Sequence, residues 1–328
     1  MISILMPVFN EEKHLKTCLD SILNQTEEDW ELVVVDDFSE DDSWEILESY
    51  ATKDVRIRPL KNSSKGIIPA LELAYAQSKG HFITRMDADD KMHPEKLEKM
   101  GRFLGLNPKA CVTAKVEYFS DHALSDGFLR YADWLNSMSI RGNHYDFVFK
   151  ECVIASPCWM MKRETLDMIG GICSGRYPED YDMVFRLYEN EIVIKSVSEI
   201  LHFWRDHDAR ASRNDPNYAQ QDFIELKLFY LKKLKKIGEK ELILWGAGAA
   251  GKLWAKALIK EDIAFRWVTE NQKKIGKDIY GVRIEHTENI GSSEDAVLLL
   301  AIKAPSFYEE RKKLIEVYEK KQQLVYLY

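Results

Sequence analysis

The stretch HFITRMDADD, residues 81–90, ends an apolar segment with three closely spaced carboxylates. Its first part is typical of a buried strand, and KMHPEKLEKM, residues 91–100, is typical of a helix start. Asp87, Asp89 and Asp90 repel one another as like charges. A divalent cation would offset that repulsion, because Mg²⁺ and Mn²⁺ commonly bind one or two carboxylates together with phosphate oxygens. The alternative is an acidic helix start in which Asp90 is the N-cap.

Strand and helix patterns alternate through the first half of the chain. We predict strands at residues 2–9, 30–37, 55–60 and 81–88, with an amphipathic helix after each of the first three. Repeated β-α units imply a parallel sheet with helices on both faces, and such sheets bind ligands at the carboxyl ends of their strands. Asp36 and Asp37, which end the second strand, should therefore line one crevice with Asp87 and Asp89.

The pattern is less regular from about residue 110 to residue 206. We predict short helices at 131–138 and 144–151, a strand followed by a helix within 158–171, and a helix at 178–191. The polar segment 202–218 is predicted to be a loop. A basic amphipathic helix and a second series of β-α units follow. These predictions divide the chain into a domain at 1–217, a linker helix at 218–238 and a small α/β domain at 239–328.

Composition places the chain among soluble globular proteins. Of 328 residues, 45% are apolar and 30% are charged, and the formal net charge of −8 argues against generic nucleic-acid binding. The five cysteines form no CxxC pair, which indicates reduced thiols in a cytoplasm. We see no signal peptide and no apolar run of about 18 residues. A cytoplasmic protein is expected, with peripheral contact at the inner face of the membrane as an open alternative.

Five blocks stand in a particular order: PVFNEE (7–12), VVVDDFSEDDS (33–43), RMDADD (85–90), PEDYD (178–182) and WRDHDARAS (204–212). This order resembles glycosyltransferase family 2, whose members are inverting hexosyltransferases of GT-A fold that use nucleotide-diphosphate sugars. The resemblance covers roughly residues 1–215. It implies metal-assisted transfer, with Mn²⁺ or Mg²⁺, from a UDP-sugar to the hydroxyl of a glycan or lipid-linked acceptor.

The resemblance also implies roles for individual residues. Those matched to the nucleotide are Pro7, Val8, Phe9, Glu11, Asp37 and Lys65. Asp89 is the implied direct metal ligand, Asp87 contacts the ribose or the metal, and His207 is a third metal ligand. Arg205 or Arg210 contacts the diphosphate.

Asp180 matches the family's general base, and Glu179 beside it helps to hold the acceptor. An inverting reaction needs such a carboxylate to remove the proton of the attacking hydroxyl. Cys158 and Trp159 would face the donor sugar or the acceptor.

Each of these assignments has a plainer alternative. Phe9 could close the core, Lys65 could be a solvated lysine, and His207 could simply be exposed. Glu179 and Asp180 suit the first turn of a helix by charge alone. Cys158 and Trp159 could be core residues.

The segment GAGAAG, residues 246–251, follows a predicted strand and opens a predicted helix. That context is typical of a dinucleotide-binding turn, so Gly246, Gly248 and Gly251 are candidate cofactor contacts. Glu270 lies close to the spacing expected for the acid that ends the next strand. We expect an accessory Rossmann-like domain that binds a nucleotide, docks a partner or forms a homo-oligomer; an empty scaffold is the alternative.

Two other functions compete with the transferase. One is an NAD-linked oxidoreductase centred on residues 240–328, and the other is a non-catalytic nucleotide-sugar-binding module. The basic helix carries Lys232, Lys233, Lys235 and Lys236, which could meet an anionic membrane surface or form a solvated face.

Overall fold

The chain forms two compact units in a computed structural model. The model describes residues 1–122, 124, 126–172, 175–208, 210, 220–234, 236–237, 240–290, 296–303, 307–308, 312–321 and 323–328. The first unit comprises Met1–Asp146 and Cys152–Tyr218, and the second comprises Phe147–Glu151 and Ala219–Tyr328. Each unit is built on its own sheet.

The first unit contains an eight-stranded mixed sheet in the described part of the chain, with the order β3-β2-β1-β4-β7-β6-β8-β5. Its strands are β1 (Ile2–Val8), β2 (Trp30–Asp36), β3 (Ile57–Lys61), β4 (Phe82–Arg85), β5 (Lys91–Met92), β6 (Cys111–Phe119), β7 (Trp159–Lys162) and β8 (Ile194–Arg205). Strands β1 to β4 are parallel, and β7 joins them to β6 through two antiparallel pairings. The predicted α/β fold with its parallel β-α core is therefore confirmed.

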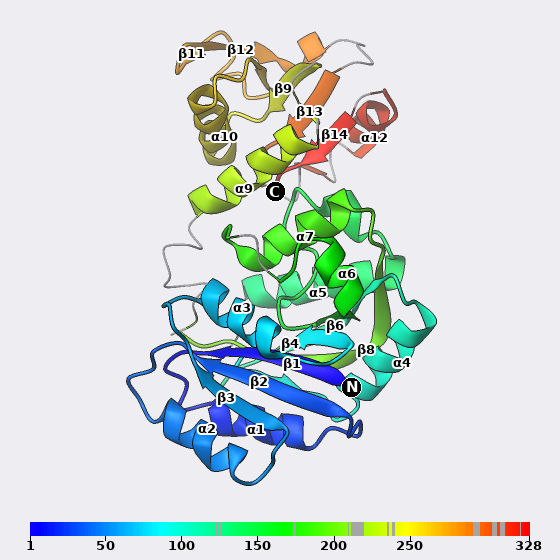
Figure 1. Ribbon diagram of the computed structural model, residues 1–328. Helices are drawn as coiled ribbons and strands as arrows, with labels where there is room; N and C mark the ends of the chain where they lie inside the picture. The colour runs from blue at the N-terminus through cyan, green and yellow to red at the C-terminus, as the bar shows by residue number, and fades with distance from the viewer. Residues whose placement is uncertain are drawn as a thin grey trace. The chain divides into compact units, whose positions relative to one another are not determined.

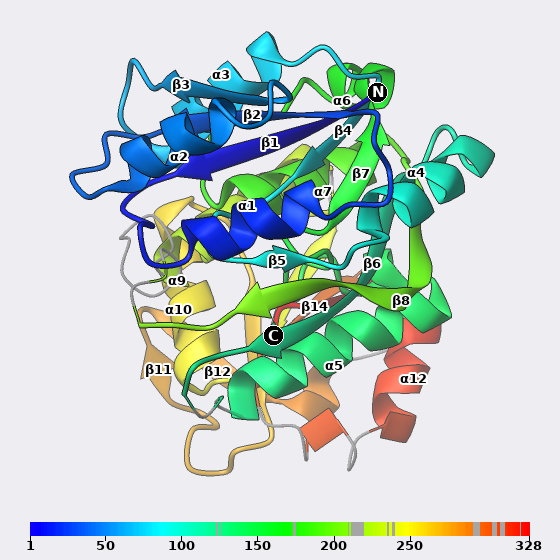
Figure 2. The same cartoon turned by 90° about the horizontal axis from the view of Figure 1, so that it is seen from below.

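Helices cover both faces of this sheet (Figures 1 and 2). They are α1 (Leu15–Leu23), α2 (Ser43–Ala51), α3 (Ile67–Gln77), α4 (Lys96–Leu106), α5 (Asp126–Arg141), α6 (Arg163–Met168) and α7 (Glu179–Glu189). Figure 1 shows α1 and α2 on one side of β1 and β2, with α3 on the other. Strand β2 is buried along its whole length and β1 is buried except at Pro7, because both faces of each strand pack against helices.

Two sequence predictions in this unit were wrong. Segment 202–218 was expected to be a loop, but β8 continues through His202 to Arg205, with His202 fully buried. Polar residues can extend a strand in this way when partners within the fold satisfy them. Residues 206–208 and 210 belong to no helix or strand, and the rest of the segment lies outside the described residues. The short helix expected at 131–138 lies within the longer α5, but the helix expected at 144–151 is only a 3₁₀ turn at His144–Phe147.

The pairing of β8 with β6 is irregular. Ala114 pairs with Val197, but Lys115 pairs with Ile200 and Val116 with His202. The pairing thus advances five residues on β8 for two on β6, which leaves three residues of β8 as bulges.

The second unit has six strands in its described residues, in the order β11-β12-β10-β9-β13-β14. They are β9 (Glu241–Trp245), β10 (Arg266–Thr269), β11 (Asp278–Ile279), β12 (Val282–His286), β13 (Ala296–Leu300) and β14 (Gln323–Tyr326). All neighbouring pairs except β11 with β12 are parallel. This is the strand order of a small Rossmann-like sheet.

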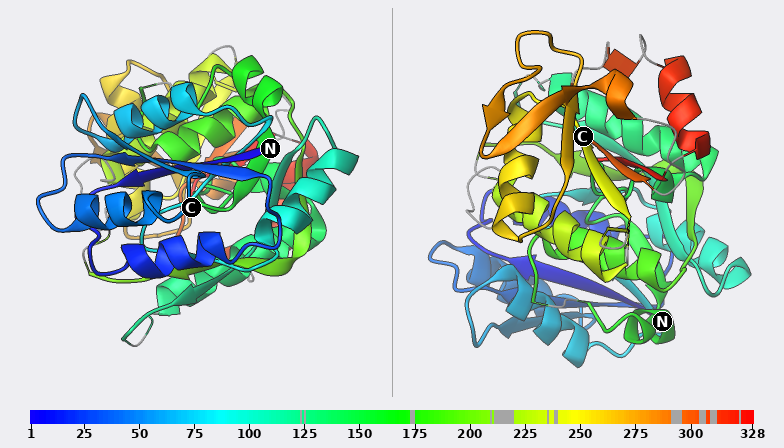
Figure 3. Two further views of the ribbon diagram at one scale, coloured as in Figure 1. Left: turned by 60° about the horizontal axis from the view of Figure 1, so that its bottom comes forward. Right: turned by 90° about the horizontal axis from the view of Figure 1, so that it is seen from above.

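Helices flank this second sheet as well. They are α9 (Gln220–Lys233), α10 (Ala249–Lys260) and α12 (Lys312–Lys321), with a 3₁₀ turn at Thr287–Ile290. Figure 3 shows α10 and α12 on opposite sides of the strands. None of the helices described in either unit is long and apolar enough to cross a lipid bilayer.

The glycine-rich turn joins β9 to α10 tightly. Gly246 has a φ of 120°, which side-chain-bearing residues rarely adopt. A Cβ at Gly251 would lie only 1.8 Å from the carbonyl oxygen of Gly246, which accepts a hydrogen bond from Trp267 Nε1 at 2.8 Å. A Cβ at Gly248, in contrast, would meet no atom within 4 Å. The first and third glycines therefore serve close packing, and the second leaves open space at the start of α10.

Gly251→Ala should destabilise the second unit by about 1–3 kcal/mol, because the added methyl group displaces the Gly246 carbonyl and its bond to Trp267. Gly248→Ala is the matched control and should change the free energy of unfolding by less than about 0.5 kcal/mol. Urea unfolding monitored by tryptophan fluorescence measures both. Equal stability of the two variants would contradict the close packing at Gly251.

Candidate active site

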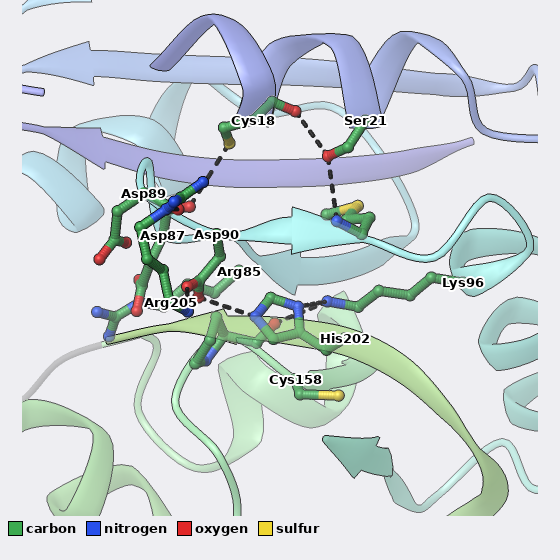
Figure 4. Close-up of polar contacts among 12 residues, drawn as sticks. Cys18, Ser21, Arg85, Asp87, Asp89, Asp90, Lys96, Cys158, His202 and Arg205 are labelled. Atoms are coloured by element: carbon green, nitrogen blue, oxygen red, sulfur yellow. Dashed lines mark hydrogen bonds and ion pairs between the residues drawn. The ribbon is translucent and has the colours of Figure 1, made fainter. Parts of the chain in front are cut away.

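Figure 4 shows the three carboxylates of the acidic loop, residues 87–90, which follows β4. Each carboxylate has a different partner. Asp87 pairs with Arg85, whose Nε lies 2.8 Å from Oδ1. Asp89 Oδ2 lies 3.0 Å from His207 Nε2. Asp90 contacts His202 and the backbone N–H of Arg205. The side chains of Asp87 and Asp89 are 22% and 14% exposed, whereas Asp90 is completely buried, so only the first two could reach a ligand.

A buried polar chain holds Asp90. Lys96 Nζ donates to the carbonyl of Pro157 at 2.8 Å and lies 2.9 Å from His202 Nδ1. His202 Nε2 lies 2.8 Å from Asp90 Oδ2, and Arg205 N–H donates to Asp90 Oδ1 at 2.7 Å. Burial and the Lys96 charge hold the pKa of His202 well below its usual value, so the ring is neutral. Its Nδ1 accepts from Lys96 and its Nε2–H donates to Asp90.

Asp90 is therefore not a helix cap, since α4 begins at Lys96 with Glu95 as its N-cap residue. Burial, reinforced by the charges of Asp89 and Asp87, raises the pKa of Asp90 well above its usual value. The carboxylate ties the acidic loop to the end of β8.

The loop is also attached to α1 (Figure 4). Cys18 Sγ donates to the carbonyl of Asp87 at 3.5 Å. Ser21 Oγ donates to the carbonyl of Cys18 and accepts the N–H of Met92 at 3.0 Å. The backbone on both sides of the three carboxylates is thus fixed by α1 on one side and β8 on the other.

Arg85 connects the acidic loop to the start of α7. Besides Asp87, its guanidinium binds Glu179, with Nη1 2.9 Å from Oε1. Both Arg85 and Glu179 are almost fully buried. Asp180 follows Glu179 in the first turn of α7, and its Oδ1 accepts the N–H of Tyr181. Burial, followed by the charge of Glu179, raises the pKa of Asp180 to about 7.

His207 lies beside Asp89 and close to the start of α1. Its ring centroid is 4.9 Å from that of His14, and one potential ligand atom of each of Glu11, His14 and His207 lies within 4.8 Å of the others. Burial and the charges of Asp89 and Asp41 raise the pKa of Glu11 to about 8. Despite burial, the hydrogen bond with His207 lowers the pKa of Asp89. Carboxylate and imidazole groups gathered in this way have the chemistry of a divalent-metal site.

The residues matched to the nucleotide lie at the ends of β1 and β2 and, for Lys65, in the turn after β3. Asp37 is buried and accepts bonds from Asn62 Nδ2 at 2.7 Å and from the N–H of Gly66 at 2.9 Å. Its own N–H donates to the carbonyl of Val8 at 2.7 Å, next to the half-buried Pro7. Asp37 therefore fixes the turn at 62–66 against the end of β1.

Phe9 and Lys65 contact each other across this edge of the sheet. Lys65 Nζ lies 4.7 Å from the centre of the Phe9 ring, and Phe9 is 45% exposed. Phe9 is thus not a core residue, and its ring is available for stacking.

Arg205 is buried by its neighbours. Its Nε donates to the carbonyl of Asp89 at 2.8 Å, and its guanidinium lies 4.4 Å from the centre of the Phe119 ring. Cys158 and Trp159 are also fully buried, at the start of β7. The core interpretation of Cys158 and Trp159 is therefore correct.

In the second unit the candidate residues lie where a dinucleotide turn would place them. Gly246 to Gly251 join β9 to α10, and Glu270 directly follows β10. Lys232 of the basic helix forms an ion pair with Glu261 at 2.8 Å, and Lys235 lies outside the described residues.

Sequence reasoning missed four residues that shape this site: His14, Arg85, Lys96 and His202. Arg85 stands two residues before Asp87 in the sequence, so its charge alone could have indicated a partner for that carboxylate. Lys96 and His202 carry no local signal, because their hydrogen bond joins residues 106 positions apart.

Replacing Asp90 should affect stability, whereas replacing Asp89 should not. In Asp90→Asn one of the two buried donors, Arg205 N–H or His202 Nε2–H, would face an amide NH₂, at a cost of about 1–3 kcal/mol. Asp89→Asn, the matched control, relieves crowding of charge and should cost less than about 1 kcal/mol. Denaturant unfolding at pH 7 tests this pair, and equal losses would contradict the structural role of Asp90.

Comparisons with known proteins agree with this architecture. The family model described as glycosyl transferase family 2 matches residues 3–170, more than half of the chain. The O-antigen biosynthesis glycosyltransferase WbnJ of Escherichia coli is 28% identical over 238 residues, which cover 71% of this chain and 90% of WbnJ. The putative glycosyltransferase EpsH of Bacillus subtilis is 35% identical over 104 residues, 32% of this chain and 30% of EpsH.

Solved structures share the fold at lower identity. TarS residues 1–349 of S. aureus, solved with UDP-GlcNAc, superpose with a TM-score of 0.57 at 18% identity, covering 78% of this chain and 71% of that one. The mannosyltransferase PcManGT of Pyrobaculum calidifontis, solved with GDP-Man and Mn²⁺, gives 0.52 at 16% identity, covering 73% and 65%. With the matched family model, the sheet order and the acidic loop after β4, these findings show that the chain belongs to glycosyltransferase family 2 and is a glycosyltransferase.

Proposed function

We propose that the first unit transfers a sugar, with inversion and with the help of a divalent metal, from a nucleotide-diphosphate sugar to an acceptor hydroxyl. The observation that carries this proposal is the position of Arg85, which binds Asp87 of the acidic loop and Glu179 at the start of α7. One buried guanidinium thereby brings the motif for the donor diphosphate and the motif for the general base into one site.

The proposed metal ligands are Asp89 and His207, with Asp87 at the ribose or the metal. Asp89 Oδ2 and His207 Nε2 lie 3.0 Å apart, so the carboxylate and the imidazole could both reach one cation. Mn²⁺ or Mg²⁺ there would neutralise the charge that develops on the departing diphosphate. Arg205 supports the loop through the Asp89 carbonyl, and Arg210 belongs to the same segment.

The proposed nucleotide site comprises the turns after β1 and β2. Phe9 offers an exposed ring for base stacking, and Lys65 lies above it. Asp37, Pro7, Val8 and Glu11 are proposed to complete the contacts with base and ribose. The solved complex of TarS with UDP-GlcNAc, which has the same fold, supports a UDP-sugar as the donor.

Asp180 is the proposed general base. It would accept the proton of the acceptor hydroxyl as that oxygen bonds to the anomeric carbon, while the bond from this carbon to the diphosphate oxygen breaks. A pKa of about 7 is well matched to this task, because the carboxylate can accept a proton near neutral pH. Glu179, held by Arg85, is proposed to help position the acceptor.

The acceptor is proposed to be a growing surface glycan or its lipid-linked precursor. The similarity to WbnJ, an O-antigen biosynthesis glycosyltransferase, along most of its length supports this choice.

Residues 239–328, linked through helix 218–238, are proposed to be an accessory Rossmann-like domain. The open space at Gly248, at the start of α10, is the part of the glycine turn that could admit a phosphate; Glu270 would then face a ribose. Docking of a partner or a homo-oligomer is the other proposed role of this domain.

Asp180→Asn should lower kcat by about 10²–10⁴-fold and leave the dissociation constant of the donor unchanged. In the wild type, kcat should rise with pH through about 7, because the base works only when deprotonated. Initial rates with isotope-labelled donor between pH 5.5 and 9 measure both effects. Asp133→Asn, at an exposed position of α5, is the control. Near wild-type turnover by Asp180→Asn would disprove the assignment of the base.

The donor should raise the melting temperature only in the presence of metal. A ligand at 100 times its Kd that binds only the native state stabilises it by about 2.7 kcal/mol. A thermal-shift panel of UDP-, GDP-, dTDP- and CMP-sugars and NAD(H), each with Mn²⁺ or EDTA, identifies the donor. Asp89→Ala should abolish the shift and Asp133→Ala should retain it. Stabilisation by NAD(H) alone, without metal, would favour an oxidoreductase centred on the second unit.

A further inference from the structure

His14 is a buried histidine to which the family resemblance gives no role. It occupies the N-cap position of α1 and is only 6% exposed. Its Nδ1 lies 3.1 Å from Glu11 Oε2, one turn earlier. Its Nε2 is buried and has no hydrogen-bond partner in the described part of the chain.

An unpaired polar atom in the interior is unfavourable, and such atoms in native proteins usually meet a ligand, water or ion. Because Nδ1 of His14 faces Glu11, Nε2 is the ring nitrogen left for a ligand, and its lone pair is available when Nδ1 carries the proton. This is the usual arrangement of a metal-binding histidine, whose second nitrogen donates to a carboxylate that fixes the ring.

The position of His14 matches this chemistry. Its ring lies 4.9 Å from that of His207, which contacts Asp89 at 3.0 Å. One potential ligand atom of each of Glu11, His14 and His207 lies within 4.8 Å of the others, so a nitrogen of His14 is close to a nitrogen of His207. Glu11 and His14 lie in the turn between β1 and α1, and His207 lies just after β8. His207 connects both to the acidic loop through Asp89.

We infer that His14 is an additional metal ligand, which together with His207 and Asp89 forms a two-histidine, one-carboxylate site. Glu11 acts as a positioning residue that orients the His14 ring. The inference rests on the proposed function, because it takes Asp89 and His207 as metal ligands, and it extends that function in two respects.

The first consequence concerns the choice of metal. Imidazole nitrogen suits transition metals, whereas Mg²⁺ prefers oxygen ligands alone. The site should therefore bind Mn²⁺ or Co²⁺ more tightly than Mg²⁺. The second consequence concerns the order of binding. Mg²⁺ sites of the usual kind depend on substrate phosphates, but three protein ligands can hold a transition metal before any nucleotide arrives.

The test is metal binding by the full-length protein without nucleotide. Titration with Mn²⁺, following free Mn²⁺ by electron paramagnetic resonance, gives the affinity, and competition with Mg²⁺ gives the selectivity. Loss of a ligand should weaken binding at least as much as loss of an outer-shell partner does, so His14→Phe should weaken Mn²⁺ binding by about tenfold or more. The visible absorption spectrum of bound Co²⁺ should change in the same variant, because one nitrogen ligand is removed.

Two further variants complete the experiment. His14→Asn removes the imidazole without adding bulk, in case the phenyl ring disturbs folding, and far-ultraviolet circular dichroism verifies the fold of each variant. His81→Ala, at an exposed histidine just before β4, should bind Mn²⁺ as the wild type does.

Unchanged Mn²⁺ affinity and an unchanged Co²⁺ spectrum in folded His14→Phe or His14→Asn would overturn the inference. Absence of Mn²⁺ binding by the nucleotide-free wild type would overturn it as well. In either case, metal-dependent donor binding that is lost in Asp89→Ala would leave the proposed function standing, so the two failures are distinguishable.

Discussion

Three carboxylates within four residues can coexist at the end of a strand only if each has its own partner. In this glycosyltransferase the partners come from two parts of the chain, the end of β4 and residues 202–207. Asp87 pairs with Arg85, Asp89 with His207, and Asp90 with His202 and the backbone of Arg205. Each pairing draws another segment to the acidic loop: α7 through Arg85, and β8 with the residues after it through the other two. The contacts that compensate the charge of the three aspartates therefore also bring the parts of the site together.

Local patterns were enough to predict the first four strands, the helices between them and the location of the acidic loop. Those features depend on hydrophobic periodicity and on the topology of parallel sheets, both of which can be read from neighbouring residues. The sequence pattern predicts a loop at 202–205 because these residues begin the polar stretch 202–218. The buried hydrogen bonds from Lys96 through His202 to Asp90, which hold this part of β8, leave no local signal. The pairing of His202 with Asp90 spans 112 positions, and no periodicity encodes it.

The residues that we propose for the reaction also fall into two groups: those that a local sequence motif reveals and those that only the structure reveals. Asp87, Asp89, Glu179 and Asp180 could be named because motifs carry them. His14 could not, because a histidine near the start of an amphipathic helix is unremarkable until its unpaired nitrogen is seen beside another imidazole. The glycine turn of the second unit is intermediate: its pattern was visible, but only the geometry separates the glycines required for packing from the one that leaves open space.

The bulges between β6 and β8 have a consequence for how the molecule can change over evolution. If the pairing continued without interruption from Ala114 and Val197, Val116 would face Glu199; the three extra residues put His202 there instead. Because side chains alternate between the two faces of a strand, an odd offset exchanges the inward and outward sets. The length of the segment between Val197 and His202 thus determines whether His202 can reach Asp90 of the acidic loop. Losing a single residue there would turn His202 towards solvent and remove its hydrogen bond to Asp90. This short stretch should therefore tolerate substitutions far better than insertions or deletions.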